Sequence, residues 1–327
     1  RTPLYWCYTA MMKTAYPMWP SLALLVLCWA SIQVVHGFST NHDRSVASRR
    51  EAALFMSSSS GNTKKGKVLV LGGTGFVGQT VCRRASLEGY SVTSLSRRGL
   101  PPSAADSKSS SSSNTDYRIG DARKVEPIRN ILNEGGYVAV IHCIGLLFDD
   151  ASGLGTYNRF VSGSGSVPDT NSTYETITQL TGLNAIEATS EYIASNPSID
   201  AKDFPFIFVS AAEVGWKEGS FGSAMQGGDV MEKFLAPEWL RRYLAAKRAV
   251  EEKLYQELSA GRLRPVILRP SLVYSLDRPA SYLPVGAFFI GNRVGLPFVD
   301  RPVTVQALSN AMIRSISRQN VSGIQRY

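Results

Sequence analysis

A short apolar run that leads into three evenly spaced glycines is the feature that most constrains the fold of this chain. Residues 67–71 are mostly aliphatic, and Gly72, Gly75 and Gly78 follow before an amphipathic helical pattern begins. Glycines at this spacing permit a tight turn and let backbone N–H groups approach a pyrophosphate at the start of the helix. The order strand, glycine turn, helix predicts a dinucleotide-binding loop; the alternative is a glycine-rich turn that binds nothing.

Segments typical of strands and of helices alternate along the rest of the body. Short β-branched or aromatic runs are expected to form strands, and longer amphipathic stretches to form helices. The expected strands are 67–71, 91–95, 117–119, 138–142, 206–209 and 265–268. The expected helices are one ending near 88 and those at 122–134, 173–194, 238–259 and 305–317. This alternation predicts an α/β fold with a doubly wound parallel (Rossmann) sheet.

The length of the body suits one large domain with a small appendage. We expect a Rossmann domain at 66–270 and a small C-terminal substrate or cap region at 271–327. Within that region, residues 271–300 are predicted to be irregular. A Pro/Ser-rich loop at 100–115 and a Gly/Ser-rich insertion at 149–168 are also predicted.

The end of the second expected strand indicates the cofactor. NAD-binding folds place an Asp or Glu there for the ribose 2′-hydroxyl, whereas this chain has Arg97 and Arg98. Two guanidinium groups suit a 2′-phosphate, so NADP(H) is favoured over NAD(H); the alternative is a solvated pair of arginines. Asp121, just after the third strand, is placed to accept from the adenine amino group. The expected cofactor-binding residues are Gly72, Thr74, Gly75, Phe76, Val77, Gly78, Arg97, Arg98 and Asp121.

Tyr243 and Lys247 form the strongest catalytic signal, because an i,i+4 pair lies on one face of a helix. Lys247 falls within the apolar stripe of this helix, where a lysine is costly unless it has a task. A cationic neighbour is expected to lower the pKa of the Tyr243 phenol. Ser210, at the end of the fifth strand, sits on the edge where open α/β sheets bind ligands. The alternative is a chance Tyr-x-x-x-Lys spacing. The stripe consists of Leu240, Leu244, Val250, Leu254 and Leu258.

The segments GGTGFVG, SRRG, GD, FVSAAE, YLAAKRAVEE and LRPSLVY resemble extended or atypical short-chain dehydrogenases/reductases of the NAD-dependent epimerase/dehydratase type. The resemblance covers roughly residues 66–320. It is greatest to the group containing the NADPH-binding accessory subunit of respiratory complex I, a mitochondrial coenzyme Q biosynthesis protein and plastoglobule-associated relatives. The resemblance implies Ser210, Tyr243 and Lys247 as the catalytic constellation.

Two features depart from the pattern of that family. Thr178 occupies the helix position where many extended members have an active-site Asn. The stretch between Ser210 and Tyr243 is longer than usual and contains the glycine-bearing segment 219–228. Some members of the group bind NADPH without known turnover, so an intact triad does not by itself establish catalysis.

The composition excludes several classes of function. The net charge of +9 includes no dense basic run, so a nucleic-acid partner is not expected. Four cysteines without CxxC spacing and three scattered histidines indicate neither a disulfide framework nor a metal site. The mild positive excess suits an anionic cofactor or a membrane surface.

Residues 1–56 are interpreted as a targeting leader. A cationic start and an apolar run at 21–30 predict a signal peptide over about 12–37. Residues 38–56 begin with a Phe and are rich in Ser and Arg, which is typical of transit peptides. This arrangement resembles the bipartite plastid presequence of algae. Plastid localisation is predicted, with the mitochondrion as the alternative.

Three hypotheses for the function follow. The first is an NADP(H)-dependent oxidoreductase, or an isomerase with transient hydride transfer, that acts on a hydrophobic carbonyl or quinone; the apolar segment 282–290 favours such a substrate unless it is simple core. The second is a non-catalytic NADPH-binding assembly factor associated with a membrane or a quinone-biosynthesis complex. The third, weaker one is a nucleotide-sugar epimerase or dehydratase, against which the small C-terminal region counts.

Overall fold

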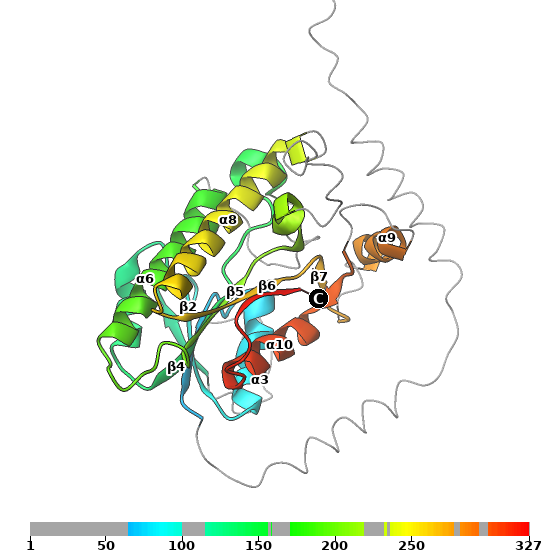
Figure 1. The fold of residues 1–327 in the computed structure, drawn as a ribbon. Coiled ribbons are helices and arrows are strands. Elements are labelled where there is room, and N and C mark those ends of the chain that lie inside the picture. The colour runs from blue at the N-terminus through cyan, green and yellow to red at the C-terminus, as the bar shows by residue number, and fades with distance from the viewer. Residues whose placement is uncertain are drawn as a thin grey trace, which may run out of the picture. The chain divides into compact units, whose positions relative to one another are not determined.

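A seven-stranded parallel sheet forms the centre of the described part of the chain (Figure 1). The expected leader and most of the two expected loops lie outside the described residues. The structure, a computed structural model, describes residues 65–99, 115–155, 158, 171–218, 232–233, 236–277, 282–293 and 300–326.

The sheet has the order β3-β2-β1-β4-β5-β6-β9, and every pairing is parallel. Its strands are β1 (Lys67–Leu71), β2 (Ser91–Ser96), β3 (Thr115–Ile119), β4 (Tyr137–His142), β5 (Pro205–Val209), β6 (Arg264–Arg269) and β9 (Gly323–Arg326). The central strands β1 and β4 are buried on both faces, which explains their nearly continuous aliphatic sequences. The winding reverses between β1 and β4, the point where open α/β sheets bind ligands. The expected doubly wound parallel sheet is confirmed.

Helices cover both faces of this sheet (Figure 1). They are α3 (Phe76–Leu87), α4 (Val125–Leu132), α6 (Leu180–Ala194), α8 (Glu238–Ser259), α9 (Tyr282–Arg293) and α10 (Val305–Ser317). Helices α3 and α10 pack on one face, and α4, α6 and α8 on the other, because parallel strands need crossover connections. Each face has its own apolar core. Most of the expected α8 stripe is buried, but Leu258 is 38% exposed because it lies in the last turn.

Five shorter elements lie outside the seven-stranded sheet and its long helices in the described ranges. They are the 3-10 helices η2 (Asp150–Ser152) and η5 (Ala212–Glu218), the π-helix η4 (Glu175–Gln179), and the parallel pair of β7 (Val273–Tyr274) and β8 (Val303–Thr304). The expected helix at 173–194 therefore exists, but it begins with a π turn. The start of the expected 149–168 insertion is ordered as η2, which corrects its interpretation as loop throughout.

The C-terminal region differs from the prediction in two ways. Residues 271–300 are not wholly irregular, since they contain β7 and α9. Strand β9 follows α10 and pairs with β6, so the sheet draws on residues beyond 270. Buried Arg264 helps to fix the position of β9, because its guanidinium donates to the Ser315 carbonyl in the last turn of α10 and to the carbonyls of Arg318 and Val321 between α10 and β9.

No helix within the described ranges combines the length and the apolar character required to cross a bilayer.

Candidate active site

The predicted site residues gather at the carboxyl edge of the sheet. The register aligns the strand ends, because Leu71 of β1 pairs with Leu95 of β2 and with His142 of β4. On the other side, Val209 of β5 pairs with Leu268 of β6. The glycine loop, the end of β2 and Ser210 therefore all leave the sheet at one edge, where α8 brings Tyr243 and Lys247.

The glycine loop is too tightly packed for side chains at several positions. Gly72 has φ +84°, which favours glycine. A Cβ at Gly78 would lie 2.2 Å from the Gly72 carbonyl oxygen, and one at Gly73 would lie 2.2 Å from Ser94 Oγ. Gly75 is the N-cap of α3 and supplies no side-chain cap. Backbone N–H groups at the start of α3 are thus presented to a ligand, and the loop fits a dinucleotide pyrophosphate.

The other predicted loop residues line the same turn. Thr74 is buried, and its carbonyl accepts a hydrogen bond from Gln79 Nε2 at 2.8 Å, which fixes the turn against α3. Phe76 and Val77 form the first turn of α3 and are half-buried. These residues therefore lie together in the turn and at the start of α3, and their contact with a cofactor stays a prediction.

The end of β2 presents two exposed arginines. Ser96 Oγ accepts from the backbone N–H of Gly99 at 3.1 Å, which closes a turn around Arg97 and Arg98. Asp121 lies near this turn, since Arg97 contributes to the lowering of its pKa. The main cause of that lowering is Arg123, which donates to both Asp121 carboxylate oxygens. Asp121 is therefore a fixed carboxylate, and Arg123 is a third guanidinium here that the sequence analysis missed.

Ser210 directly follows β5 and carries a buried hydroxyl. Its backbone N–H donates to the Leu268 carbonyl at 2.7 Å, which holds it against β6. The residue is 3% exposed, and its Oγ has no hydrogen-bond partner among the described residues. A buried hydroxyl left unpaired is costly, so this atom is suited to bind a ligand group.

Lys247 projects from α8 beneath the ends of β4 and β5. Its Nζ donates to the Val209 carbonyl at 2.6 Å and lies 4.8 Å from the centre of the Phe208 ring. A Cβ at Gly145, just beyond β4, would lie 3.6 Å from Nζ, so the glycine leaves room for the ammonium group. Burial lowers the pKa of Lys247 to about 8. Lys247 is thus buried and makes a polar contact, and its catalytic role stays a prediction.

Tyr243 lies one helical turn before Lys247 on the same helix. Its ring packs with Ala211 and Val214, and the Lys247 Nζ is 5.8 Å from the ring centre. Burial raises the pKa of the phenol, and the nearby Glu213 raises it further. The expected lowering of this pKa is therefore wrong for the protein alone, because the Lys247 ammonium is engaged with Val209 and desolvation dominates.

Two more polar groups adjoin this edge. Glu213 of η5 interacts electrostatically with Tyr243, and burial raises the pKa of its carboxyl to about 7. Thr178, on the π-helix η4, is fully buried, and its Oγ1 has no hydrogen-bond partner within the described ranges. π turns are frequent at functional sites. Thr178 also holds the position where many members of the family that the sequence resembles have an active-site Asn. Glu213 was missed because a single acid after a strand has no distinctive spacing.

The amino edge of the sheet, opposite the candidate site, holds a cavity but none of the predicted catalytic residues. A polar cavity of about 340 Å³ lies there, lined by Lys67, Ser91 and Thr115 at the amino ends of β1, β2 and β3. It is separated from the candidate catalytic residues by the length of the strands. In the described ranges no three His, Cys, Asp or Glu side chains gather as metal ligands would.

Comparisons with known proteins agree with this fold. Residues 68–162 match the NAD dependent epimerase/dehydratase family. Over 284 residues the chain is 23% identical to MIOREX complex component 2 of Saccharomyces cerevisiae, covering 79% of this chain and 96% of the yeast protein.

Solved structures show the same architecture. Pal from Bacillus thuringiensis aligns with a TM-score of 0.53 and 19% identity, covering 80% of this chain and 77% of that one. The UDP-glucose 4-epimerase of Thermus thermophilus, solved with NAD, aligns with a TM-score of 0.50 and 21% identity over 80% and 76% of the two chains. The chain thus shares the Rossmann fold of these structures.

Proposed function

We propose that this protein is an NADP(H)-dependent oxidoreductase of the short-chain dehydrogenase/reductase type that acts on a hydrophobic carbonyl or quinone. The observation that carries the proposal is the buried Ser210 hydroxyl, which has no partner among the described residues and lies at the strand edge that also receives Tyr243 and Lys247. The tightly packed glycine loop two strands away supplies the matching place for a dinucleotide.

Three groups of residues would hold NADP(H). The backbone of the glycine loop and the start of α3 would bind the pyrophosphate, and Arg97 and Arg98 would bind the 2′-phosphate. Lys247 would hold the nicotinamide ribose. When bound, the cofactor supplies or accepts a hydride.

Proton transfer falls to Tyr243. Its raised pKa keeps the phenol protonated at neutral pH, so it is a donor in the direction of carbonyl reduction. Ser210 Oγ would donate a hydrogen bond to the same substrate oxygen and orient it. The Lys247 ammonium, 5.8 Å from the ring centre, would be a nearby cation for the phenolate that remains after the proton leaves.

The nature of the substrate is proposed from the region around α9. Phe289 and Ile290 on this helix are 37% and 44% exposed, and Leu276 before it is 60% exposed. Apolar side chains of this size left in water favour an apolar ligand or a membrane surface. A quinone or another lipid carbonyl fits this chemistry.

The test is a fluorescence titration of the full chain with NADPH and NADH. We expect at least about tenfold tighter binding of NADPH, equivalent to about 1.4 kcal/mol. Substitution of both Arg97 and Arg98 by Ala should remove the preference and leave NADH binding unchanged. Absence of binding of either nucleotide would exclude the enzyme as proposed.

The family match supports a second candidate, an epimerase or dehydratase that returns its hydride. Both activities would use Tyr243 and Lys247, so mutation of these residues does not separate them. The stoichiometry does: a reductase consumes one NADPH per product, whereas an epimerase or dehydratase leaves the nucleotide unchanged in amount.

The name of the yeast relative supports a third candidate, a component of a protein complex whose fold is stabilised by the nucleotide. Tyr243→Phe discriminates, because it removes the transferable proton and keeps the ring. A deletion strain rescued by the Phe variant as well as by wild type would indicate an assembly role. A deletion rescued by wild type alone would indicate catalysis.

The composition of residues 1–56 is the basis for proposing an organelle as the destination, with the plastid proposed first and the mitochondrion as the alternative. A fluorescent reporter fused to residues 11–60 tests this in algal cells. Mitochondrial fluorescence would overturn the plastid proposal.

A further inference from the structure

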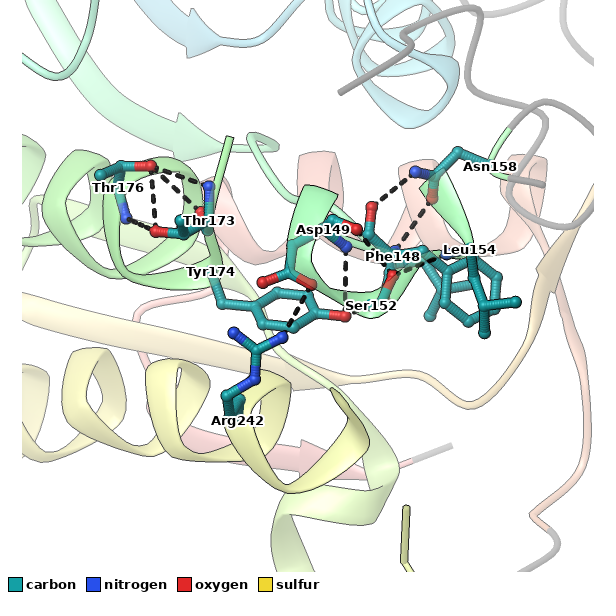
Figure 2. A network of polar contacts seen from close by, with 10 residues as sticks. Phe148, Asp149, Ser152, Leu154, Asn158, Thr173, Tyr174, Thr176 and Arg242 are labelled. Atoms are coloured by element: carbon teal, nitrogen blue, oxygen red, sulfur yellow. Dashed lines mark hydrogen bonds and ion pairs between the residues drawn. The ribbon is translucent and has the colours of Figure 1, made fainter. Parts of the chain in front are cut away.

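A half-buried ion pair joins the segment after β4 to helix α8, one residue before Tyr243 (Figure 2). Asp149 is fully buried, and its Oδ1 accepts a hydrogen bond from Nη2 of Arg242 at 3.0 Å. The second carboxylate oxygen, Oδ2, is buried without a hydrogen-bond partner in the described part of the chain. Such a half-satisfied carboxylate is costly, so stability alone does not explain its presence.

Tyr174 connects this ion pair to Tyr243. Its hydroxyl donates to the Leu147 carbonyl at 2.8 Å and accepts from the backbone N–H of Asp149 at 3.3 Å (Figure 2). The Arg242 guanidinium lies 5.4 Å from the centre of the Tyr174 ring. The same ring meets the Tyr243 ring nearly perpendicularly, with centres 5.6 Å apart and an interplanar angle of 69°. Tyr174 is thus held from one side and touches Tyr243 on the other.

A second ion pair on α8 shows what a fully satisfied arrangement looks like. Arg248, just after Lys247, donates to both carboxylate oxygens of buried Glu232, at 3.0 and 2.6 Å. Among the described residues Arg242 instead donates a single hydrogen bond to Asp149, and its guanidinium carbon lies 5.4 Å from the centre of the Tyr174 ring. Asp149 therefore lacks the two-point ion pair that Glu232 makes with Arg248, and the Arg242 guanidinium lies near the Tyr174 ring instead.

We propose that Asp149, Arg242 and Tyr174 form a clamp that positions the Tyr243 phenol for proton transfer. Asp149 holds Arg242 and the hydroxyl end of Tyr174, and Tyr174 then fixes the plane of the Tyr243 ring. The three are positioning residues, since none of them is placed against the reacting atoms. The proposal rests on the proposed role of Tyr243 as the proton donor.

The test observes the Tyr243 ring directly by fluorine NMR of the full chain labelled with 3-fluorotyrosine. Tyr243→Phe assigns the resonance by its disappearance. Asp149→Asn, which preserves volume, and Tyr174→Leu, which removes the ring, should both move the Tyr243 resonance from its wild-type position. Tyr174→Phe keeps the ring and should leave the resonance closer to that position than Tyr174→Leu does.

Glu257→Gln is the matched control for general loosening of the helix. Glu257 is also a buried carboxylate paired with an arginine, Arg262, but it lies about 21 Å from Tyr243 along α8. The control should lower the melting temperature and leave the Tyr243 resonance in place. An unmoved resonance in Asp149→Asn and Tyr174→Leu, or an equal movement in Glu257→Gln, would overturn the clamp.

A second measurement separates the clamp from the proposed function. For a carbonyl or quinone that the wild type reduces, Asp149→Asn should lower kcat roughly 10- to 100-fold, as expected for a misplaced proton donor, with KM and NADPH affinity within about twofold. A proportional rise in KM with unchanged kcat would contradict positioning. If the wild type binds no nucleotide, the proposed function fails, and the fluorine result still decides whether the clamp exists.

Discussion

The charge state of Lys247 should change how the free energy of unfolding depends on pH. Burial lowers its pKa from 10.5 to about 8. Between these values the unfolded chain binds more protons than the folded one, so the free energy of unfolding rises with pH. Relative to Lys247→Met, the wild type should therefore gain about 3 kcal/mol from pH 8 to 10.5. Urea denaturation of both proteins across this pH range measures the difference in their free energies of unfolding.

Lys202→Met, which removes an exposed lysine, is the control for the loss of one charge. A gap between wild type and Lys247→Met that stays constant with pH would contradict the assigned burial of the ammonium group. The comparison also isolates Lys247 from the tyrosines that titrate near the upper end of the range.

At this scale the sequence predicted the residues that share one local pattern and missed those that depend on distant contacts. Tyr243 and Lys247 are four positions apart on one helix, so their common face follows from periodicity. Asp149 and Arg242 are separated by 93 positions, and no local pattern announces their contact. The pKa of Tyr243 was predicted in the wrong direction because desolvation depends on packing that spacing does not encode.

The packing of α6 against α8 depends on one glycine within a helix. A Cβ at Gly182 would lie 2.7 Å from Val250 Cγ2 and 2.9 Å from Cγ1. Alanine favours a helix by about 1 kcal/mol over glycine, but overpacking of this kind costs about 1–3 kcal/mol. Gly182→Ala should therefore have a net cost of up to about 2 kcal/mol in unfolding free energy, measured by denaturant titration.

The combination with Val250→Ala provides the check, because truncation of Val250 removes the methyl groups that the new Cβ would meet. The double variant should be more stable than the sum of the single effects implies. Strict additivity would show that the close approach of α6 and α8 is not what requires the glycine.

Long elements were predictable because their patterns are strong, and short ones were not. Helix α8 has the predicted bounds, since its apolar stripe and the preceding proline mark it clearly. Strand β9 has only four residues and exists because β6 leaves an edge to pair with. Helix α9 contains Pro284 and two glycines, but the proline falls in the first turn, where the missing N–H costs little. The π turn of η4 has the same apolar periodicity as an ordinary helix start.

Cofactor binding should act on much of the described fold, because the proposed NADPH contacts come from β1 and β2 and from α3 and α8, which cover opposite faces of the sheet. A ligand that binds only the folded state at 100 times its Kd adds about 2.7 kcal/mol of stability. For a domain of this size that corresponds to a rise in Tm of roughly 5–10 °C. NADH at the same concentration should raise Tm less, and Arg97→Ala with Arg98→Ala should reduce the NADPH effect to that of NADH. Calorimetry measures both shifts, and equal effects of the two nucleotides on the wild type would contradict the role given to the arginines.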